Sequence, residues 1–292
     1  MTQHSSADSG TLQVNVSVVI PTCNRAGTLA RALDSVVSQT RAPLEIIVID
    51  DGSSDSTREL VRNYPGIGYY YQANRGVSAA RNAGIARARG NWLAFLDSDD
   101  EWLPGKLAAQ CRAIERHPGY RICHTDEIWI RHNRRVNPMR KHAKSGGWIY
   151  EKCLPMCVIS PSSALVHESV FQQVGKFDES LPACEDYDLW LRICSAWPVL
   201  FLDEFLLKKY GGHPDQLSRK HWGMDRFRVR ALEKMLRMGT LVPAQRSATR
   251  EVLLHKLRIL HSGARSRNNR ELVQECCEKI AAYENLPEAS GS

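Results

Sequence analysis

The chain has 292 residues, of which 43% are hydrophobic and 24% are charged, as in an ordinary soluble globular protein with a large core. No apolar run is long enough to span a bilayer, and the polar first thirteen residues lack the profile of a signal peptide, which argues against an integral membrane protein. The formal net charge of +7 fits a solvated basic surface, but it also favours anionic partners such as nucleotide diphosphates, nucleic acid or an anionic membrane face.

The first hundred residues alternate between apolar strands and amphipathic helices. The periodicity predicts strands over 14–20, 44–49, 67–72 and 92–96, and helices over 25–39, from a cap at Ser54 or Asp55 to residue 63, and over 77–89. Such alternation predicts an α/β fold with a largely parallel sheet covered on both faces, in which ligands bind beyond the carboxyl ends of the strands. The polar residues that follow three of these strands should meet at one rim: Thr22, Asn24 and Arg25, then Asp50 and Asp51, then Asp97 and Asp99.

The rest of the chain is less regular. We predict strands over 121–130, 162–167 and 199–205, and helices over 104–117, 168–174 and 186–196. The basic stretch 131–147, with Pro138, Gly146 and Gly147, is predicted to be a mobile loop. Amphipathic, basic-leaning helices follow over 225–238, 243–262 and 270–283. We therefore divide the chain into a flexible N-terminus over 1–13, an α/β domain over 14–220 and a helical C-terminal segment over 221–292.

The nine cysteines are odd in number and scattered, which predicts reduced thiols in a cytosolic protein rather than a disulfide framework. Cys153 and Cys157 have the spacing of one helical turn. No His or Cys pair follows them at the intervals of a zinc site, so we interpret both as core thiols.

Clustered carboxylates follow the apolar strand over 92–96, in the order Asp97, Ser98, Asp99 and Asp100. Neighbouring acids repel one another unless a cation offsets their charge. Hard carboxylate oxygens with few other ligands suit Mg²⁺ or Mn²⁺ that bridges substrate phosphates. The alternative is a helix cap with solvated acids.

Four further motifs carry side chains suited to chemistry. The turn at Asp51 could bind a base or ribose or simply cap a helix, and Arg81 could face a phosphate or solvent. Glu185 and Asp186 stand where acids favour a helix N-terminus, and a catalytic interpretation requires one of them to act as a general base. His213 follows a flexible Gly pair and is either structural or a metal ligand.

In this order the segments resemble glycosyltransferase family 2, which comprises inverting enzymes with the GT-A fold. The joint pattern spans roughly residues 14–215 and is more specific than any one of its pieces. The matching segments are the opening strand over 16–25, the turn Asp50-Asp51-Gly52-Ser53, the N-x-G-x-x-x-A-R-N-x-G helix over 74–84, the D-x-D element Asp97-Ser98-Asp99, and the pair Glu185-Asp186.

The resemblance implies a role for each matching residue. Asp186 would be the catalytic base with Glu185 supporting it, Asp99 the direct metal ligand, and His213 a further ligand. Arg81 would lie near ribose or phosphate, and Asp97 near the ribose. The residues that would hold the sugar nucleotide are Pro21, Thr22, Asn24, Arg25, Asp51, Arg81, Asp97 and Ser98.

The implied activity is metal-dependent hexosyl transfer with Mn²⁺ or Mg²⁺, from a UDP-sugar, or alternatively a dTDP- or GDP-sugar, to an acceptor hydroxyl. The acceptor would be a glycan or a lipid-linked molecule in bacterial surface glycan, polysaccharide or glycolipid synthesis. The Q-x-x-R-W element of processive members is missing, because Lys220 stands where Trp would follow Gln216 and Arg219, so a single-addition enzyme is favoured.

Two other classes of function stay open. A non-catalytic GT-A module could hold a nucleotide sugar or glycan without turnover, but the presence of both Asp99 and Asp186 argues against it. Nucleic-acid binding is disfavoured because the basic residues are not interleaved with aromatic side chains. The C-terminal helices could cover the acceptor side, form a homodimer contact or rest on anionic lipid. We expect a cytoplasmic protein, with peripheral contact at the inner face of the membrane as the alternative.

Overall fold

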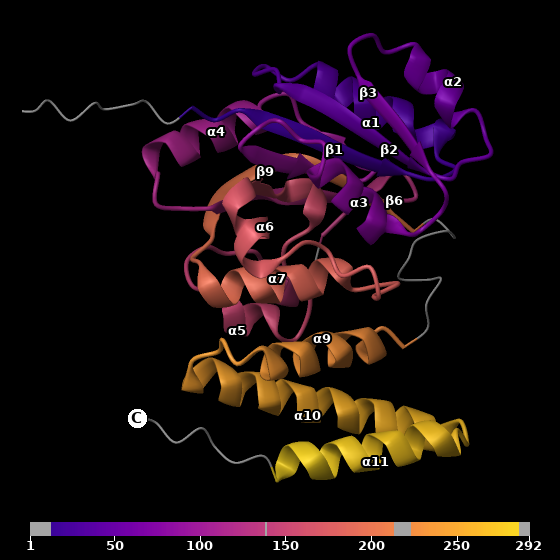
Figure 1. The fold of residues 1–292 in the computed structure, drawn as a ribbon, viewed down its shortest axis with the longest axis vertical. Coiled ribbons are helices and arrows are strands. Elements are labelled where there is room, and N and C mark those ends of the chain that lie inside the picture. The colour runs from indigo at the N-terminus through magenta and orange to yellow at the C-terminus, as the bar shows by residue number, and fades with distance from the viewer. Residues whose placement is uncertain (1–12, 138, 213–222, 286–292) are drawn as a thin grey trace, which may run out of the picture.

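The computed structural model describes residues 13–137, 139–212 and 223–285, which form an α/β fold around one sheet. The strand order is β3-β2-β1-β4-β8-β6-β9-β5, with β7 also paired to β6. Helices cover the sheet, and three C-terminal helices are stacked at the far end of the molecule (Figure 1).

The strands are β1 (Val16–Thr22), β2 (Glu45–Asp51), β3 (Gly68–Gln72), β4 (Trp92–Phe95), β5 (Glu101–Trp102), β6 (Ile122–Arg131), β7 (Arg134–Val136), β8 (Leu165–His167) and β9 (Leu200–Gly211). The α-helices are α1 (Ala26–Val37), α2 (Thr57–Arg62), α3 (Val77–Ile85), α4 (Lys106–Arg116), α5 (Tyr150–Cys153), α6 (Glu168–Val174), α7 (Glu185–Ala196), α9 (Asp225–Met238), α10 (Pro243–Ser266) and α11 (Arg270–Glu284).

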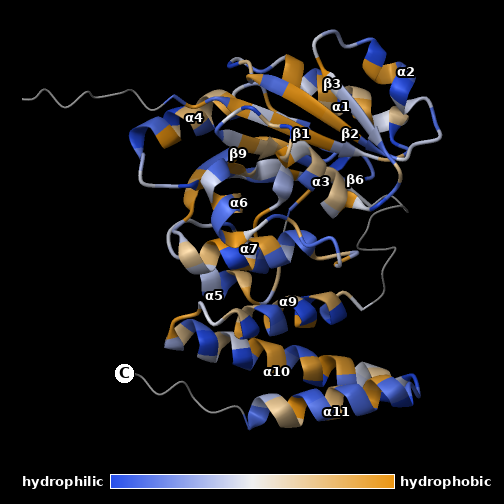
Figure 2. Cartoon of the chain, viewed as in Figure 1, coloured by the Kyte–Doolittle hydropathy of each residue, from blue (hydrophilic) through white to orange (hydrophobic). Residues whose placement is uncertain are grey.

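The predicted parallel half of the sheet is confirmed. β2 and β4 lie parallel on either side of β1, and β3 lies parallel to β2. Of these strands, β1, β2 and β4 are largely apolar (Figure 2). Alternate residues of β1 serve the two faces, so that Val18 packs in the same cluster as α1 while Val19 packs with the helices of the other face. Gly84 lets α3 approach β1 closely, because a Cβ atom at this position would lie 2.2 Å from Val19 Cγ1.

The second half of the sheet is mixed. β8 is antiparallel to both β4 and β6, β5 is antiparallel to β9, and β6 and β9 are parallel. β9 continues beyond the predicted end at residue 205 because its later residues pair with β6 and β5. The register between β6 and β9 shifts around Asp126, as in a β-bulge. As a result, the end of β9 reaches the acidic turn that follows β4.

The prediction of a loop over 131–147 is wrong in part. Residues 134–136 form β7, which folds back on β6, and residues 140–142 form a turn of 3₁₀-helix. The two strands are joined by His132 and Asn133, both with positive φ, as in the tight turns that match the twist of a hairpin. This turn lacks the glycine that usually marks it, so the sequence carried no clear signal for it.

The C-terminal helices extend the core of the α/β domain. α9 packs on α7, α10 packs on α9 and α5, and α11 packs on α10. One apolar cluster runs from β4 through α7 into these helices, and includes Phe95, Trp190, Leu232 and Leu257. Polar contacts add to it: Lys256 Nζ of α10 donates to the Pro155 carbonyl at 2.9 Å.

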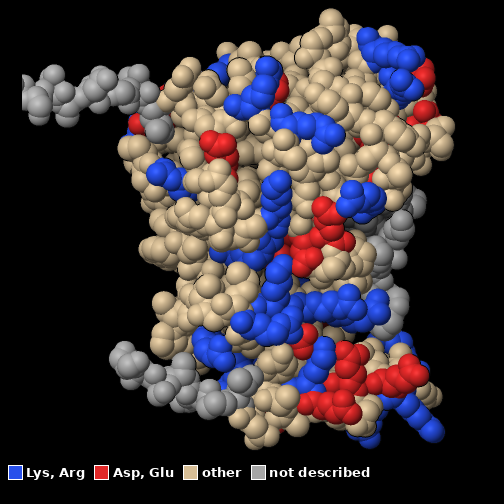
Figure 3. Space-filling view, viewed as in Figure 1, with Lys and Arg blue, Asp and Glu red and all other residues tan. Residues whose placement is uncertain are grey.

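The third C-terminal helix is acidic and not basic-leaning, because α11 has four Glu residues against one Arg and one Lys. On the face seen in Figure 3, acidic side chains gather over this helix. Such a surface does not favour contact with anionic lipid through α11. In the parts of the chain that the structure describes, no helix combines the length and the hydropathy needed to cross a membrane.

Candidate active site

The predicted polar residues meet at the carboxyl ends of β1, β2 and β4. Arg25 Nη1, just beyond β1, lies 3.2 Å from Asp99 Oδ2 in the turn after β4. Arg81 of α3 lies 2.7 Å from Asp97 Oδ1 and 2.7 Å from Glu185 Oε1 at the start of α7. The rim therefore joins segments that are far apart in the sequence.

Arg81 is the buried centre of this network. Its side chain is only 3% exposed. Burial alone would lower the pKa of Arg81, but the negative charges of Asp97 and Glu185 raise it overall, so the guanidinium remains charged. The ionised form of Glu185, by contrast, is destabilised by its surroundings. Its burial and the neighbouring charge of Asp186 raise the pKa of Glu185 to about 7, although Arg81 opposes the shift.

The acidic turn divides into exposed and buried carboxylates. Asp100 is buried, and its oxygens accept hydrogen bonds from Ser162 Oγ at 2.7 Å and from the Tyr210 amide at 3.0 Å. Burial and the charges of Asp99 and Asp97 raise the pKa of Asp100 well above its ordinary value. Asp97 and Asp99 keep 30% and 18% of their side chains exposed. Asp100 thus ties the turn to β9, while the other two face outward.

Arg31 and Tyr210 hold the turn from its other side, and sequence reasoning missed both. Arg31 of α1 donates to the Asp99 carbonyl, and its guanidinium lies 3.7 Å from the centre of the Tyr210 ring. Tyr210 Oη donates to Glu101 at 2.8 Å. Arg31 is one polar residue of an amphipathic helix, so nothing in the sequence distinguishes it from a solvated arginine.

Asp51, predicted to line a nucleoside pocket, also organises the start of α3. Its Oδ1 accepts from Gln72 Nε2 at 2.7 Å and from the Arg75 amide at 2.9 Å, and its Oδ2 accepts from the Gly76 amide at 2.8 Å. Gly52 has φ +85°, and a Cβ atom there would lie 2.8 Å from the Asn74 nitrogen. The turn after β2 therefore fixes the loop that leads to Arg81.

The residues at the end of β1 differ in their surroundings. Pro21 and Thr22 are buried in the last positions of the strand, and Thr22 Oγ1 has no hydrogen-bond partner among the described residues. Asn24, with φ +51°, donates its amide to Ser53 Oγ at 2.8 Å and accepts from the Ser54 amide at 2.8 Å. These bonds hold the ends of β1 and β2 together.

Asp186 is the second residue of α7, which begins after Cys184, a residue with a left-handed backbone. Its Oδ1 accepts from the Tyr187 amide at 2.7 Å, and Cys157 Sγ lies 3.2 Å from its Oδ2. Cys157 was predicted to be a core thiol; instead it is half-buried and contacts a site residue. Partial burial alone would lower the pKa of Lys209, but nearby negative charges, including that of Asp186, raise it overall. Lys209 and Cys157 had not been predicted at the site.

The outward-facing carboxylates suit a divalent cation. Within residues 13–137, 139–212 and 223–285, no three His, Cys, Asp or Glu side chains gather at metal-binding distance. Asp97 and Asp99 could nevertheless hold Mg²⁺ or Mn²⁺, because such ions often use one or two carboxylates and complete their shell with substrate phosphates and water. Ser98 between them is buried. His213, the predicted further ligand, lies outside the described residues.

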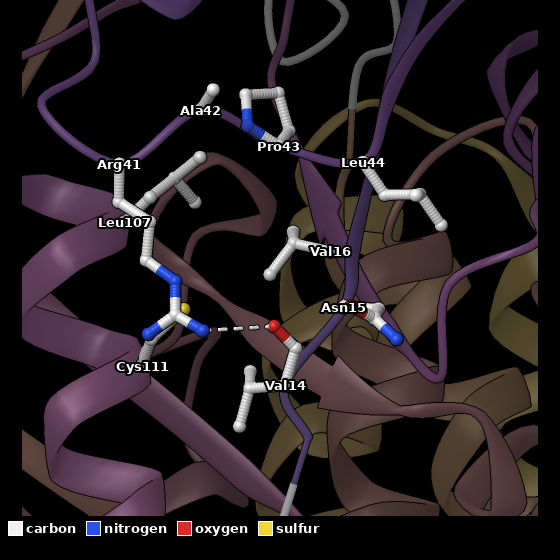
Figure 4. A pocket seen from close by; sticks show the side chains of 9 residues that line it. All are labelled: Val14, Asn15, Val16, Arg41, Ala42, Pro43, Leu44, Leu107 and Cys111. Carbon is white, nitrogen blue, oxygen red and sulfur yellow. Dashed lines mark hydrogen bonds between the residues drawn. The ribbon is translucent and has the colours of Figure 1, made fainter.

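A small cavity of about 180 Å³ lies at the opposite end of β1, away from this rim (Figure 4). Arg41 Nη2 donates to the Val14 carbonyl beside it at 3.0 Å. None of the predicted site residues lines it. Its lining residues are Val14, Asn15, Val16, Arg41, Ala42, Pro43, Leu44, Leu107 and Cys111.

Two curated relatives are a glycosyltransferase and a protein of glycan synthesis. An uncharacterized glycosyltransferase of Rickettsia felis is 31% identical over 220 residues, which are 70% of this chain and 35% of the relative. The succinoglycan biosynthesis protein ExoO of Rhizobium meliloti is 43% identical over 105 residues, 35% of this chain and 29% of ExoO. The chain spans about one to two thirds of the length of the first curated relatives.

Solved structures match the fold. Residues 1–349 of TarS of S. aureus, in complex with UDP-GlcNAc, superpose with a TM-score of 0.68 at 18% identity, covering 83% of this chain and 71% of that TarS chain. This likeness identifies a GT-A type of fold. The model of glycosyl transferase family 2 matches residues 17–174, which is more than half of the chain and includes Arg25, Asp51, Arg81 and the Asp97–Asp99 turn. The chain belongs to glycosyl transferase family 2.

Proposed function

We propose that this family member is a metal-dependent inverting hexosyltransferase that adds one sugar to an acceptor hydroxyl. The proposed donor is a UDP-sugar, with dTDP- and GDP-sugars as alternatives. The proposed acceptor is a glycan or lipid-linked molecule of bacterial surface glycan, polysaccharide or glycolipid synthesis. The likeness to TarS, solved with UDP-GlcNAc, supports the donor class, and the likeness to ExoO supports the glycan pathway.

One contact supports this function most strongly: Arg81 joins Asp97 to Glu185 through two bonds of 2.7 Å. Asp97 belongs to the turn suited to a metal and a diphosphate. Glu185 adjoins Asp186, which is the only one of the three acids in the first turn of α7 that is partly exposed. A base and a diphosphate site beside one another are what a direct displacement requires, because the acceptor must attack opposite the leaving group.

In the proposed step, Asp186 accepts the proton of the acceptor hydroxyl as its oxygen forms a bond to the anomeric carbon. The bond between that carbon and the diphosphate oxygen breaks, and the nucleoside diphosphate leaves with the electron pair. A single in-line displacement inverts the anomeric centre. Asp99, with Asp97 beside it, would hold the divalent cation, which when bound offsets the negative charge of the diphosphate. Arg81 and Glu185 hold the turn after β4 and the first turn of α7 in fixed positions relative to one another.

The carboxylate of Asp186 provides the decisive test. Asp186→Asn should lower the transfer rate by at least roughly 100-fold, because an amide cannot accept the proton, yet leave UDP binding intact. Transfer is measured as nucleoside diphosphate release with Mn²⁺ and a panel of sugar nucleotides and acceptors, and UDP binding by calorimetry. Asp203→Asn, an exposed change on β9, is the matched control.

Loss of UDP binding together with transfer in Asp186→Asn would instead assign Asp186 to the donor site. A wild-type protein that binds UDP-sugars but turns none over with any acceptor class would favour the non-catalytic module. A thermal-shift screen of sugar nucleotides with Mn²⁺ selects the donor, since a ligand of the native state raises the melting temperature.

A further inference from the structure

The carboxylate of Asp186 is held from two directions. Its Oδ1 accepts from the Tyr187 amide, which belongs to the same helix. Its Oδ2 lies 3.2 Å from the thiol of Cys157, which belongs to the segment after α5. Among the described residues, Cys157 is the only side chain that donates a hydrogen bond to Asp186.

The Cys157 thiol stays protonated and can therefore donate a hydrogen bond to Asp186. Burial and the negative charge of Asp186 raise the pKa of the Cys157 thiol well above its ordinary value, so the sulfur keeps its proton at neutral pH. The Ile159 carbonyl, 3.1 Å away, is a competing acceptor. A charged acceptor forms the stronger hydrogen bond, which favours the carboxylate as the partner of the single S–H proton.

The segment 154–160, which carries Cys157, is fixed at both ends. The Leu154 carbonyl accepts from Tyr187 Oη at 2.5 Å, and the Pro155 carbonyl accepts from Lys256 Nζ of α10 at 2.9 Å. At the other end Ser160 Oγ donates to Glu127 of β6. The position of the thiol is therefore set by α7, by β6 and by a C-terminal helix.

Other charged groups also act on this carboxylate. Glu185 adjoins it on α7 and is itself bonded to Arg81 of α3. Burial alone would lower the pKa of Lys209 of β9, but the negative charges of Glu127, Asp100 and Asp186 raise it overall. Cys153 and Cys184 are neutral thiols nearby, with pKa values raised chiefly by a thiol neighbour and by burial, respectively.

We propose that Cys157 is a positioning residue for the base: its thiol orients the Asp186 carboxylate towards the acceptor, and α10 secures the segment that carries the thiol. This inference rests on the proposed role of Asp186. It gives the C-terminal helices a part in the reaction, because Lys256 fixes the segment at Pro155, two residues before Cys157. Cys157 itself touches neither donor nor acceptor in this role.

The test compares Cys157→Ala, which removes the donor, with Cys157→Ser, which keeps one. Cys157→Ala should lower kcat roughly tenfold with an unchanged KM for the sugar nucleotide, as expected for one hydrogen bond to a charged group. The acidic limb of its kcat–pH profile should move to higher pH, because the ionised base has lost a stabilising bond. Cys157→Ser should recover most of the rate and the wild-type profile. Cys277→Ala, at an exposed cysteine of α11, is the matched control.

A Cys157→Ala enzyme with the wild-type kcat and pH profile would overturn the proposal. So would a folded Cys157→Ser enzyme that is as impaired as Cys157→Ala, since packing and not the donor would then be responsible. Melting temperatures identify variants that fail to fold. Failure of the proposed function is a separate result: it requires Asp186→Asn to retain transfer, whatever the Cys157 variants do.

Discussion

Arg81 donates one hydrogen bond to Asp97 and another to Glu185, so a single guanidinium joins the turn after β4 to the first turn of α7. Both acids approach to 2.7 Å, and the arginine is almost wholly buried. Above pH 7, where Glu185 is ionised, two carboxylates around one cation leave the centre with net negative charge. A further positive charge on the diphosphate side would therefore be favourable, which agrees with the proposed metal.

Arg81→Lys should impair both folding and transfer. An ammonium cannot reproduce the planar fork that meets two carboxylates at once, so one acid is left buried without its partner. We expect the free energy of unfolding to fall by about 3 kcal/mol or more, and kcat/KM to fall by at least roughly 100-fold. Urea denaturation and steady-state kinetics measure the two effects. Arg87→Lys, at an exposed arginine just after α3, should change neither, and equal behaviour of the two variants would contradict the role of Arg81.

The sequence predicted Arg81 at the rim but not its second partner. Arg81 follows a run of small residues on a helix between two strands. This local pattern alone indicates that the helix buries one face. Glu185 lies 104 residues further on, beyond several irregular segments. Only the packing of α7 against the sheet brings the two together, and no local periodicity encodes that packing.

Asp99 and Asp97 should differ in their effect on the metal requirement. Asp99 pairs with Arg25 at 3.2 Å and is the proposed direct ligand, whereas Asp97 is bonded to Arg81. Asp99→Asn should raise the Mn²⁺ concentration for half-maximal activity at least roughly tenfold, because an amide oxygen carries no charge for the cation. Asp97→Asn should mainly raise the KM for the donor. Metal titrations at saturating donor distinguish the two, and an identical metal response in both variants would refute the division of roles.

The residues that the sequence did not predict share a physical reason. Lys209 and Tyr210 act at the site because β9 runs past its expected end and pairs with β6 and β5. The charged residues of β9 come in two pairs between apolar residues, and this pattern gives no sign of which end lies beside an active site. Cys157 follows a four-residue helix, and its contact with Asp186 depends on bonds from three distant elements. In the parallel half of the sheet, β1, β2 and β4 were predictable because they contain continuous apolar runs.

Lys106 offers a test of stability that is independent of catalysis. It is fully buried, its Nζ donates to Gln110 Oε1 at 2.6 Å, and it lies 4.1 Å from the centre of the Trp102 ring. Among the described residues no carboxylate forms an ion pair with it. Burial lowers the pKa of Lys106 to about 7 in the folded protein, whereas the unfolded chain keeps the ordinary value of 10.5.

The unfolded state therefore binds more protons than the folded state between pH 7 and 10.5, so this lysine makes stability rise with pH across that window. The rise amounts to about 1.4 kcal/mol per pH unit for one proton. Lys106→Met, similar in length and apolar, should be more stable than wild type at pH 7 and should lack this rise. Urea denaturation from pH 6.5 to 9.5 measures it, with the exposed Lys176→Met as control. Lys106 packs on Trp102, whose indole donates to the Ser162 carbonyl at 2.8 Å, and Ser162 Oγ in turn donates to Asp100. If the stability of Lys106→Met rises with pH as steeply as that of wild type, polar groups around Trp102 and Ser162 must stabilise the buried ammonium.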